Sequence, residues 1–191
     1  MSVHVKNLSY SYPGRSLFKN LHIDFMPSGL TLIRGPSGCG KSTFLQLIAG
    51  LKKIESGKIL LDTSRIGYIH QDCHLIDHWS LSENFSLVCK DIKQQQTEMK
   101  FFDLIVPLSQ KVHLLSGGEK QRASLIRLIL QKPELILLDE PTAHLDDDHT
   151  ASAMQRIKKE FSKKTTLVVS HDQRLTQFAD VIFDWKKEVR L

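Results

Sequence analysis

The sequence predicts an α/β fold with a mainly parallel sheet. Three short segments are apolar without alternation and end at polar residues, which is typical of buried parallel strands: residues 29–35, 134–140 and 166–172. Helical patterns lie between and after them, over residues 41–51, 117–131 and 147–161. Strands that alternate with helices indicate helices packed against a parallel sheet. Ligands bind beyond the carboxyl ends of such strands, where Gly35, Asp139 and His171 fall.

The first 28 residues follow a different pattern. Apolar and polar side chains alternate on both sides of the turn signal Pro13, Gly14 and Arg15. This pattern predicts an antiparallel β subdomain at the start of the chain.

The middle of the chain, residues 72–114, predicts a helical insert, because it has no long apolar strand and no long linker. Short amphipathic helices are expected near residues 81–89 and 97–106, and three glutamines at 94–96 indicate an exposed loop. We expect a single domain over residues 1–191, with a catalytic core and β subdomain at 1–71 and 115–191 and a helical subdomain at 72–114.

Composition excludes several classes of protein. The longest apolar runs, such as residues 135–138, are far shorter than the ~18 residues that a membrane span needs, and the first residues have no apolar signal region. Three scattered cysteines favour reduced thiols and a cytoplasmic location. The net charge is +5, but the lysine pairs are dispersed without interleaved aromatic residues, so no nucleic-acid partner is expected.

The stretch from Gly35 to Thr43, GPSGCGKST, satisfies the phosphate-loop pattern G-x-x-x-x-G-K-[ST] between a predicted strand and a predicted helix. Its glycines allow backbone N–H groups to point at phosphate oxygens, and the following helix adds its positive dipole end. Lys41 adds a full charge, and Ser42 offers a hydroxyl to Mg²⁺. The expected nucleotide-binding residues are Gly35, Pro36, Ser37, Gly38, Cys39, Gly40, Lys41, Ser42 and Thr43, with Cys39 in a variable position.

Two adjacent carboxylates, Asp139 and Glu140, end the second predicted strand. Because strand side chains alternate, we expect them to point in opposite directions and to have different tasks. Asp139 would join the Mg²⁺ shell, and Glu140 would face the γ-phosphate and accept a proton from the attacking water. His171, at the end of the third strand, would reach the same phosphate. A solvated strand end and a structural histidine are the alternatives.

A second phosphate-binding helix start occurs at residues 114–122, LLSGGEKQR, where a serine and two glycines precede an amphipathic helix. A single nucleotide has no use for both, so we expect this stretch to bind the nucleotide of a partner subunit. With these motifs in this order, the whole chain resembles the ATP-binding subunits of ABC transporters. The resemblance implies the ABC-ATPase variant of the P-loop NTPase fold, with ATP and Mg²⁺ as ligands.

The resemblance also assigns roles to single residues. LSGGE, residues 115–119, looks like the family's signature, so Ser116, Gly117 and Gly118 would contact a partner's ATP. Gln71, in GYIHQD, looks like the Q-loop glutamine, a ligand of Mg²⁺ and water near the permease contact.

Three further residues match the family's motifs. Asp146 looks like the D-loop aspartate, and His171 looks like the switch histidine. Tyr12 looks like the aromatic residue that stacks on adenine, with Tyr10 as its nearby rival and an ordinary strand aromatic as the alternative.

The sequence departs from the family pattern at two positions. Glu119 replaces the commoner glutamine of the signature, and His144 occupies a D-loop position that is usually small, so contacts between subunits would differ in detail. The insert is short and 166–172 is the last predicted strand, so we expect a minimal ATPase without an appended regulatory domain.

A rival site is a transition-metal centre. His70, His74 and His78 are spaced four residues apart and would share one face of a continuous helix. A loop after Gln71 would break this register. The resemblance to ABC transporter subunits implies instead that residues 72–81 contact the permease.

The resulting functional hypothesis is an ATPase subunit that hydrolyses ATP and drives a membrane transporter through ATP-driven dimer closure. Its partners would be an integral-membrane permease and a second ATPase subunit, in a homodimer or heterodimer, at the inner face of the membrane. The alternative is a soluble ABC-type ATPase that acts on nucleic acid or ribosomes. Its usual features, long coiled-coil arms or two cassettes in one chain, are not found here. A simple P-loop kinase or GTPase would leave LSGGE without a role.

Overall fold

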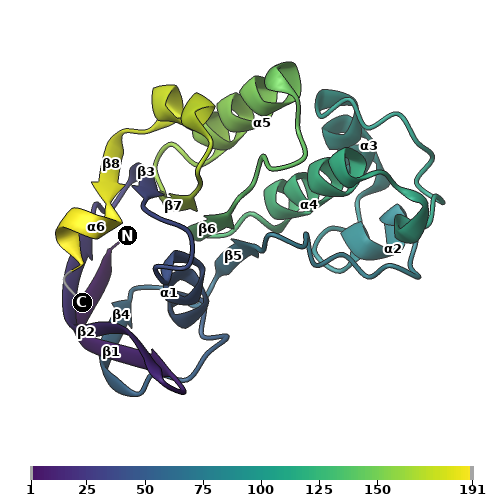
Figure 1. Ribbon diagram of the computed structural model, residues 1–191. Helices are drawn as coiled ribbons and strands as arrows, with labels where there is room; N and C mark the ends of the chain where they lie inside the picture. Colours follow the sequence, from purple (N-terminus) through teal and green to yellow (C-terminus); the bar gives the residue numbers. More distant parts are fainter. Residues whose placement is uncertain (1, 190–191) are drawn as a thin grey trace.

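The computed structural model describes residues 2–189, and its centre is a five-stranded parallel sheet in the order β5-β6-β7-β3-β8 (Figure 1). Its strands are β3 (Gly29–Arg34), β5 (Ile66–Ile69), β6 (Leu135–Asp139), β7 (Thr165–Val169) and β8 (Val181–Asp184). The three strands predicted from apolar runs are β3, β6 and β7, and they are neighbours in the sheet. All strand pairs are parallel, which confirms the predicted α/β class and brings three carboxyl ends to one edge.

An antiparallel sheet forms from the first residues, as predicted. β1 (Val3–Tyr12) pairs with β2 (Arg15–Phe25) and with β4 (Ser56–Leu61), which was not predicted. The hairpin closes where Tyr12 is opposite Arg15, and Gly14 supplies the positive φ of 77° that this tight turn needs.

The helices cover both faces of the parallel sheet. They are α1 (Lys41–Ile48), α4 (Gly117–Gln131) and α5 (Asp147–Glu160), and α4 has the predicted bounds. Alternate side chains of β6 face two cores: Leu135 and Leu137 pack with α1 and the antiparallel sheet, while Ile136 and Leu138 pack with α4, α5 and the insert. α1 therefore lies between the two sheets (Figure 1).

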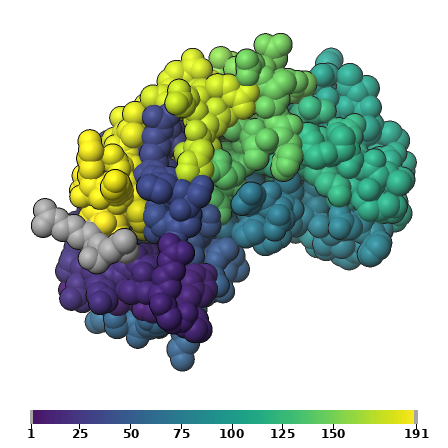
Figure 2. Space-filling model, in the orientation of Figure 1, coloured from purple at the N-terminus to yellow at the C-terminus, as the bar shows by residue number. Residues whose placement is uncertain are grey.

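The helical insert lies at the opposite end of the molecule from the antiparallel sheet (Figure 2). It contains α2 (Leu81–Ser86), α3 (Ile92–Phe101) and the short 3₁₀ helix η1 (Val112–Leu114). Ser80 and Glu83 form a reciprocal capping box that starts α2.

The glutamine run at 94–96 is not an exposed loop, and this expectation is wrong. It lies inside α3, which begins five residues earlier than the predicted segment because the Asp91 side chain accepts hydrogen bonds from the backbone N–H groups of Lys93 and Gln94. Gln95 is fully buried and donates from Nε2 to the carbonyl of Cys89 at 2.7 Å. This hydrogen bond to the Cys89 carbonyl compensates for burying the amide nitrogen of Gln95 within the helical insert.

The strand predicted at residues 166–172, which is β7 in the structure, is not the last strand of the sheet. The 3₁₀ helix η2 (Gln173–Phe178), the edge strand β8 and the short helix α6 (Trp185–Glu188) follow β7. β8 pairs only with β3, and its apolar residues Val181 and Ile182 are exposed at this edge of the sheet. Among residues 2–189, none of the helices combines the length and apolar character needed to span a membrane.

Candidate active site

The phosphate loop connects β3 to α1 and is shaped by Gly40. Gly40 caps α1 with a φ of 99°, and a Cβ at this position would lie 3.2 Å from Cε1 of Phe18 and 3.3 Å from Cδ1 of Leu17. No side chain caps α1, so its first backbone N–H groups are available to an anion.

Two residues that the sequence did not indicate support this loop. The indole of Trp185 is buried beneath it and donates to the carbonyl of Cys39 at 3.0 Å, and a Cβ on Gly35 would lie 2.8 Å from the Cβ of Trp185. From the β1–β2 turn, Arg15 donates to the carbonyl of Gly38 at 2.8 Å. The position of Arg15 in the hairpin turn is a sequence signal that could have indicated its role. Nothing in the local sequence connects Trp185 with the loop.

Lys41 is almost fully buried under the loop. Its Nζ donates to the carbonyl oxygens of Gly35 and Pro36, at 2.8 Å each, and lies 3.5 Å from Nε2 of His171. The ammonium is thus held at the centre of the loop, where a phosphate group would neutralise it.

Ser42 and Asp139 join α1 to the end of β6. The Ser42 hydroxyl donates to Oδ1 of Asp139 at 3.0 Å, and Asp139 is 1% exposed. Burial raises the pKa of the Asp139 carboxyl, although the hydrogen bond from Ser42 acts in the opposite direction. A hydroxyl and a carboxylate are hard oxygen donors, and this donor set fits Mg²⁺.

The carboxylates of Glu140 and Asp139 diverge, but strand alternation, the reason expected from the sequence, is not the cause. Glu140 has left the strand and adopts a positive φ of 49°, so a turn rather than strand alternation separates the two carboxylates. Its Oε2 accepts from Ser170 Oγ at 2.7 Å, and its Oε1 accepts from the backbone N–H of His171 at 3.2 Å. His171 also places Nε2 3.4 Å from Ser37 Oγ, so the ends of β6 and β7 and the phosphate loop meet.

A cavity of about 630 Å³ lies over these groups. It is lined by Tyr12, Arg15, Leu17, Ser37, Gly38, Gly40, Lys41, Ser42, Thr43, Gln71, Glu140, Ala143, Val169 and His171. The cavity is therefore lined by residues of the predicted phosphate loop, of both predicted strand ends and by Gln71, the second residue after β5.

Tyr12 and Tyr10 have different environments. Tyr12 is 39% exposed at the cavity, with Oη 3.3 Å from Thr43 Oγ1 and the ammonium of Lys52 5.3 Å from its ring centroid. Tyr10 does not line this cavity and packs beside Phe18. The geometry thus favours Tyr12 as the aromatic surface available to a ligand.

The signature residues Ser116, Gly117 and Gly118 do not line the cavity. Ser116 caps α4 in a capping box: its hydroxyl donates to Glu119 Oε2 at 2.7 Å and accepts from the Glu119 backbone N–H at 3.3 Å. The glycines lie against His144, and a Cβ on Gly118 would be 3.0 Å from its carbonyl oxygen.

Asp146 is likewise outside the cavity, at the start of α5. Its carboxylate accepts from the backbone N–H of His149 at 2.9 Å and lies 2.8 Å from Nδ1 of the same residue. These contacts lower the pKa of Asp146, the backbone hydrogen bond most strongly.

The three histidines of the rival metal hypothesis do not share a helix. β5 ends at Ile69, and the following turn has positive φ at Cys73 and His74. His70 and His74 stack with ring centroids 4.3 Å apart, whereas the ring of His78 lies 6.1 Å from that of His113. The three-histidine form of the hypothesis is therefore wrong, because a loop follows Gln71.

The comparison with protein families finds one that matches the chain. The model of the ABC transporter family matches residues 18–143. A protein described as a putative hemin import ATP-binding protein, HrtA, from Staphylococcus haemolyticus is 31% identical over 96% of both chains. The protein of that description from Staphylococcus aureus strain Newman is 28% identical over 94% of this chain and 93% of its own.

Solved structures support the same fold. A putative ABC transporter ATP-binding protein from Pyrococcus furiosus superposes over 100% of both chains, with a TM-score of 0.85 at 18% identity. A bacterial Atm1-family ABC exporter with ATP bound matches 96% of this chain and 37% of its own length, with a TM-score of 0.86 at 23% identity. The family match and the similar ATP-binding proteins favour a transporter ATPase over a soluble nucleic-acid or ribosome ATPase. The chain belongs to the ABC transporter family, as an ATP-binding subunit with ATPase activity.

Proposed function

We propose that this subunit holds MgATP with its phosphates on residues 35–43 and its adenine against Tyr12. The convergence of Lys41, Asp139 and Glu140 at one edge of the sheet carries this proposal. The cavity is large enough for a nucleotide, and the uncapped start of α1 suits an anion.

The metal in this proposal is bound by Ser42, Asp139 and Gln71. Mg²⁺ would neutralise charge on the phosphates that it contacts. Glu140 accepts the proton of the attacking water, and Ser170 and the backbone of His171 fix its carboxylate for this task. His171 orients the γ-phosphate, because its ring lies between Ser37 and Lys41.

A second ATPase subunit completes the site. Ser116, Gly117, Gly118 and Asp146 lie away from the cavity of their own chain, yet Ser116 and the glycines begin a 15-residue helix that suits phosphate. In a symmetric pair, the signature of each subunit would close over the ATP of the other. The second subunit is a copy of this chain or a related ATPase.

In this proposal the permease contacts residues 72–81, which follow Gln71. Ile76 and Trp79 in this segment are each 38% exposed, which is a large exposure for apolar side chains at a free surface. Docking here would hold the subunit at the inner face of the membrane. The cargo is selected by the permease, so hemin in the names of the relatives remains a property of those proteins.

Mixing two inactive variants tests the shared site. Lys41→Ala protein and Ser116→Arg protein are each expected to be inactive, since every site in each homodimer has one defective half. In a mixed dimer, one site takes Lys41 from one chain and Ser116 from the other and is whole. With random exchange about half of the dimers are mixed, so activity should recover to about a quarter of wild type.

Strong coupling between the two ATP sites would lower the activity of the mixed dimer, so a second measurement is needed. Glu140→Gln protein should dimerise on a sizing column in MgATP, because uncleaved ATP would hold the subunits together. If the mixture stays inactive and Glu140→Gln stays monomeric, the shared site is refuted for copies of this chain, and co-purification with a different ATPase subunit would then be the remaining form of the proposal.

A further inference from the structure

The turn after β5 has an unusual backbone. The N–H of Cys73 donates to the carbonyl of His70 at 2.9 Å, and the N–H of His74 donates to the carbonyl of Asp72 at 2.7 Å. Cys73 and His74 have φ values of 62° and 45°, a conformation that residues other than glycine disfavour. The turn folds the chain back so that His74 returns to His70.

Helix α4 holds this turn in place. Arg127 donates to the carbonyl of His74 at 2.8 Å, and Ser124 donates to the carbonyl of Cys73 at 3.1 Å. The thiol of Cys73 points away from the histidines and donates to Gln121 Oε1 at 3.0 Å. Contacts with a buried helix thus offset the unfavourable backbone conformation and give the turn a defined shape.

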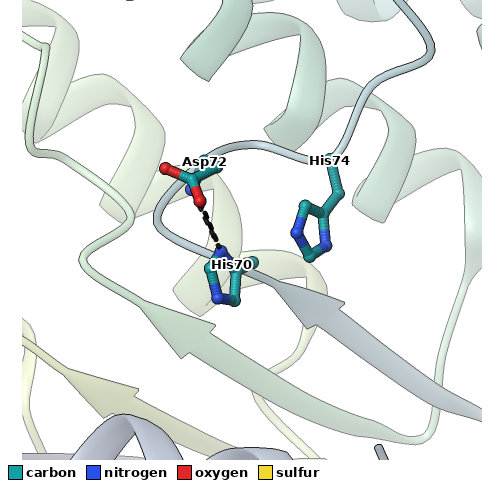
Figure 3. A group of neighbouring side chains, drawn as sticks. All are labelled: His70, Asp72 and His74. Atoms are coloured by element: carbon teal, nitrogen blue, oxygen red, sulfur yellow. Dashed lines mark hydrogen bonds and ion pairs between the residues drawn. The ribbon is translucent and has the colours of Figure 1, made fainter.

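The side chains of His70, Asp72 and His74 converge at this turn (Figure 3). One ligand atom from each lies within 4.8 Å of the others, and in residues 2–189 this is the only such group of three metal-ligating side chains. The imidazoles are stacked with an interplanar angle of 6°, and Asp72 Oδ2 lies 3.5 Å from Nδ1 of His70. On its other edge, Nε2 of His70 lies 3.3 Å from Gln46, so Nδ1 is the atom that faces the group.

We propose that His70, Asp72 and His74 form a binding site for a divalent transition metal such as Zn²⁺. Two imidazoles and one carboxylate suit zinc, cobalt or nickel, whereas Mg²⁺ prefers oxygen donors. Three protein ligands leave a further position for water. Its three ligands differ from Ser42 and Asp139, the oxygen donors proposed for Mg²⁺.

Metal binding requires small movements of these side chains. Zinc lies about 2.0–2.1 Å from its nitrogen ligands, so the three ligand atoms must move closer together. Because a metal lies in the plane of each imidazole, His74 must rotate out of its stack with His70. The metal also replaces the hydrogen bond from the Asp72 N–H to Nδ1 of His70, which is 3.2 Å long. His74 is on the exposed side of the turn and is free to rotate.

The expected consequence is a restraint on Gln71, which lies between two of the ligands. If the metal locks the turn, Gln71 cannot adjust its position in the active-site cavity that it lines. Bound metal should therefore slow ATP turnover while leaving ATP binding intact. This consequence rests on the proposed role of Gln71, but metal binding itself does not, so the two are tested separately.

The primary test measures metal binding to the full chain without nucleotide. Zn²⁺ is titrated by calorimetry, and Co²⁺ serves as a visible-absorption probe of the ligand set. His74→Asn and Asp72→Asn should each weaken binding at least about tenfold, because losing a ligand costs more than losing an outer partner. Asparagine tolerates positive φ, so His74→Asn should keep the turn. His78→Asn is the matched control and should bind as wild type does.

Several results would overturn the site. Stoichiometric binding that is equally strong in wild type and His74→Asn would place the metal elsewhere, as would thiolate-to-cobalt absorption. Absence of binding to wild type would refute the proposal outright. Circular dichroism and urea unfolding of each variant would distinguish loss of a ligand from loss of folding. If Zn²⁺ binds as proposed but does not slow turnover, the site stands and only the restraint on Gln71 fails.

Discussion

The hydroxyl of Ser42 donates to Oδ1 of Asp139 across 3.0 Å, which links the start of the phosphate-loop helix to the end of β6. In the proposed complex, the Ser42 hydroxyl and the Asp139 carboxylate would both bind a magnesium ion. Ser42→Ala and Asp139→Asn should therefore raise the Mg²⁺ concentration needed for half-maximal turnover, with the larger effect for Asp139→Asn because it removes a charge. Thr31→Ser, a substitution at another buried hydroxyl in strand β3, is the control and should leave this concentration unchanged.

The same pair predicts a pH dependence. Burial raises the pKa of Asp139 above its usual value of 3.8, and only the carboxylate form binds Mg²⁺. Affinity for Mg²⁺ should be complete above the raised pKa and fall as pH drops through it, at a higher pH than an ordinary aspartate would give. Titrations of Mg²⁺ at a series of pH values, with a nucleotide that is not hydrolysed, would show this. In Asp139→Asn the binding should be weak and its pH dependence reduced.

Glu140→Gln should retain ATP binding and lose turnover. The amide keeps the shape of the side chain but cannot accept the proton of the attacking water, and a general base is worth at least about a hundredfold in rate. Equilibrium binding of labelled ATP and single-turnover hydrolysis would separate the two effects. Turnover close to wild type would remove Glu140 from this role.

Ser170→Ala tests how Glu140 is positioned. It removes the 2.7 Å hydrogen bond to Glu140 Oε2 but leaves the backbone contact from His171. Turnover should fall less than in Glu140→Gln and ATP affinity should stay unchanged, because the carboxylate keeps its charge and loses only one of the contacts that hold it in place. Wild-type turnover in Ser170→Ala would argue against positioning.

Glu119→Gln should strengthen ATP-driven dimerisation. The Ser116 hydroxyl donates to the Glu119 carboxylate at 2.7 Å, and this charged acceptor competes with the phosphate that Ser116 would contact in a partner. A neutral acceptor is weaker by about 1 kcal/mol at each of the two shared sites, which corresponds to about a thirtyfold lower dissociation constant of the homodimer. Sedimentation of the two forms in a Glu140→Gln background would measure this.

The matched control for Glu119 lies in α2. Glu83 forms the same capping box with Ser80, whose hydroxyl donates to it at 2.7 Å, but α2 is not a phosphate-binding motif. Glu83→Gln should leave the dimer constant unchanged. If both substitutions act alike, the effect is one of helix capping and not of the signature.

The regular parts of the fold follow from local patterns. α4 could be predicted from Gly117 to Gln131, because Ser116 and Glu119 give a strong capping signal at the start of an amphipathic run. β3, β6 and β7 are buried on both faces, so apolar runs reveal them. By contrast, β4 and β8 were not predicted; they lie at sheet edges and expose some of their apolar side chains.

The candidate active site likewise combines local motifs, which could be predicted from the sequence, with tertiary contacts, which could not. The phosphate loop and the carboxylates Asp139 and Glu140 are local motifs and could be predicted. Trp185 supports the loop from 146 residues away along the chain, so only tertiary structure reveals its role. The positive φ of Glu140 also escapes prediction, because glutamate rarely adopts this conformation and surrounding contacts impose it.

An ion pair between α3 and α5 should contribute strongly to stability. Arg156 donates to both carboxylate oxygens of Glu98, from Nη2 at 2.7 Å and from Nε at 3.3 Å, and Glu98 is 6% exposed. Arg156→Met would leave the buried carboxylate unpaired and should lower the free energy of unfolding by about 3–5 kcal/mol in urea titrations. Glu98→Met in addition should restore much of this loss.

The exposed pair of Lys158 and Asp180 is the control for this effect. Its charged atoms are 2.8 Å apart, close to the 2.7 Å of the buried pair, but both side chains are largely exposed, at 41% and 39%. Lys158→Met should change the free energy of unfolding by no more than about 1 kcal/mol. Equal losses for the two substitutions would show that burial does not determine their cost.

The role of Tyr12 can be separated from phosphate binding. Its ring is exposed at the cavity, and stacking of a base on an aromatic ring contributes about 1–3 kcal/mol. Tyr12→Ala should therefore weaken ATP binding by about fivefold or more, whereas Tyr12→Phe should bind normally even though it loses the 3.3 Å contact with Thr43. Inorganic tripolyphosphate carries the phosphates without a base, so its affinity should be the same in all three proteins. If Tyr12→Ala weakens tripolyphosphate as much as ATP, Tyr12 supports the loop through Thr43, and the adenine must lie elsewhere.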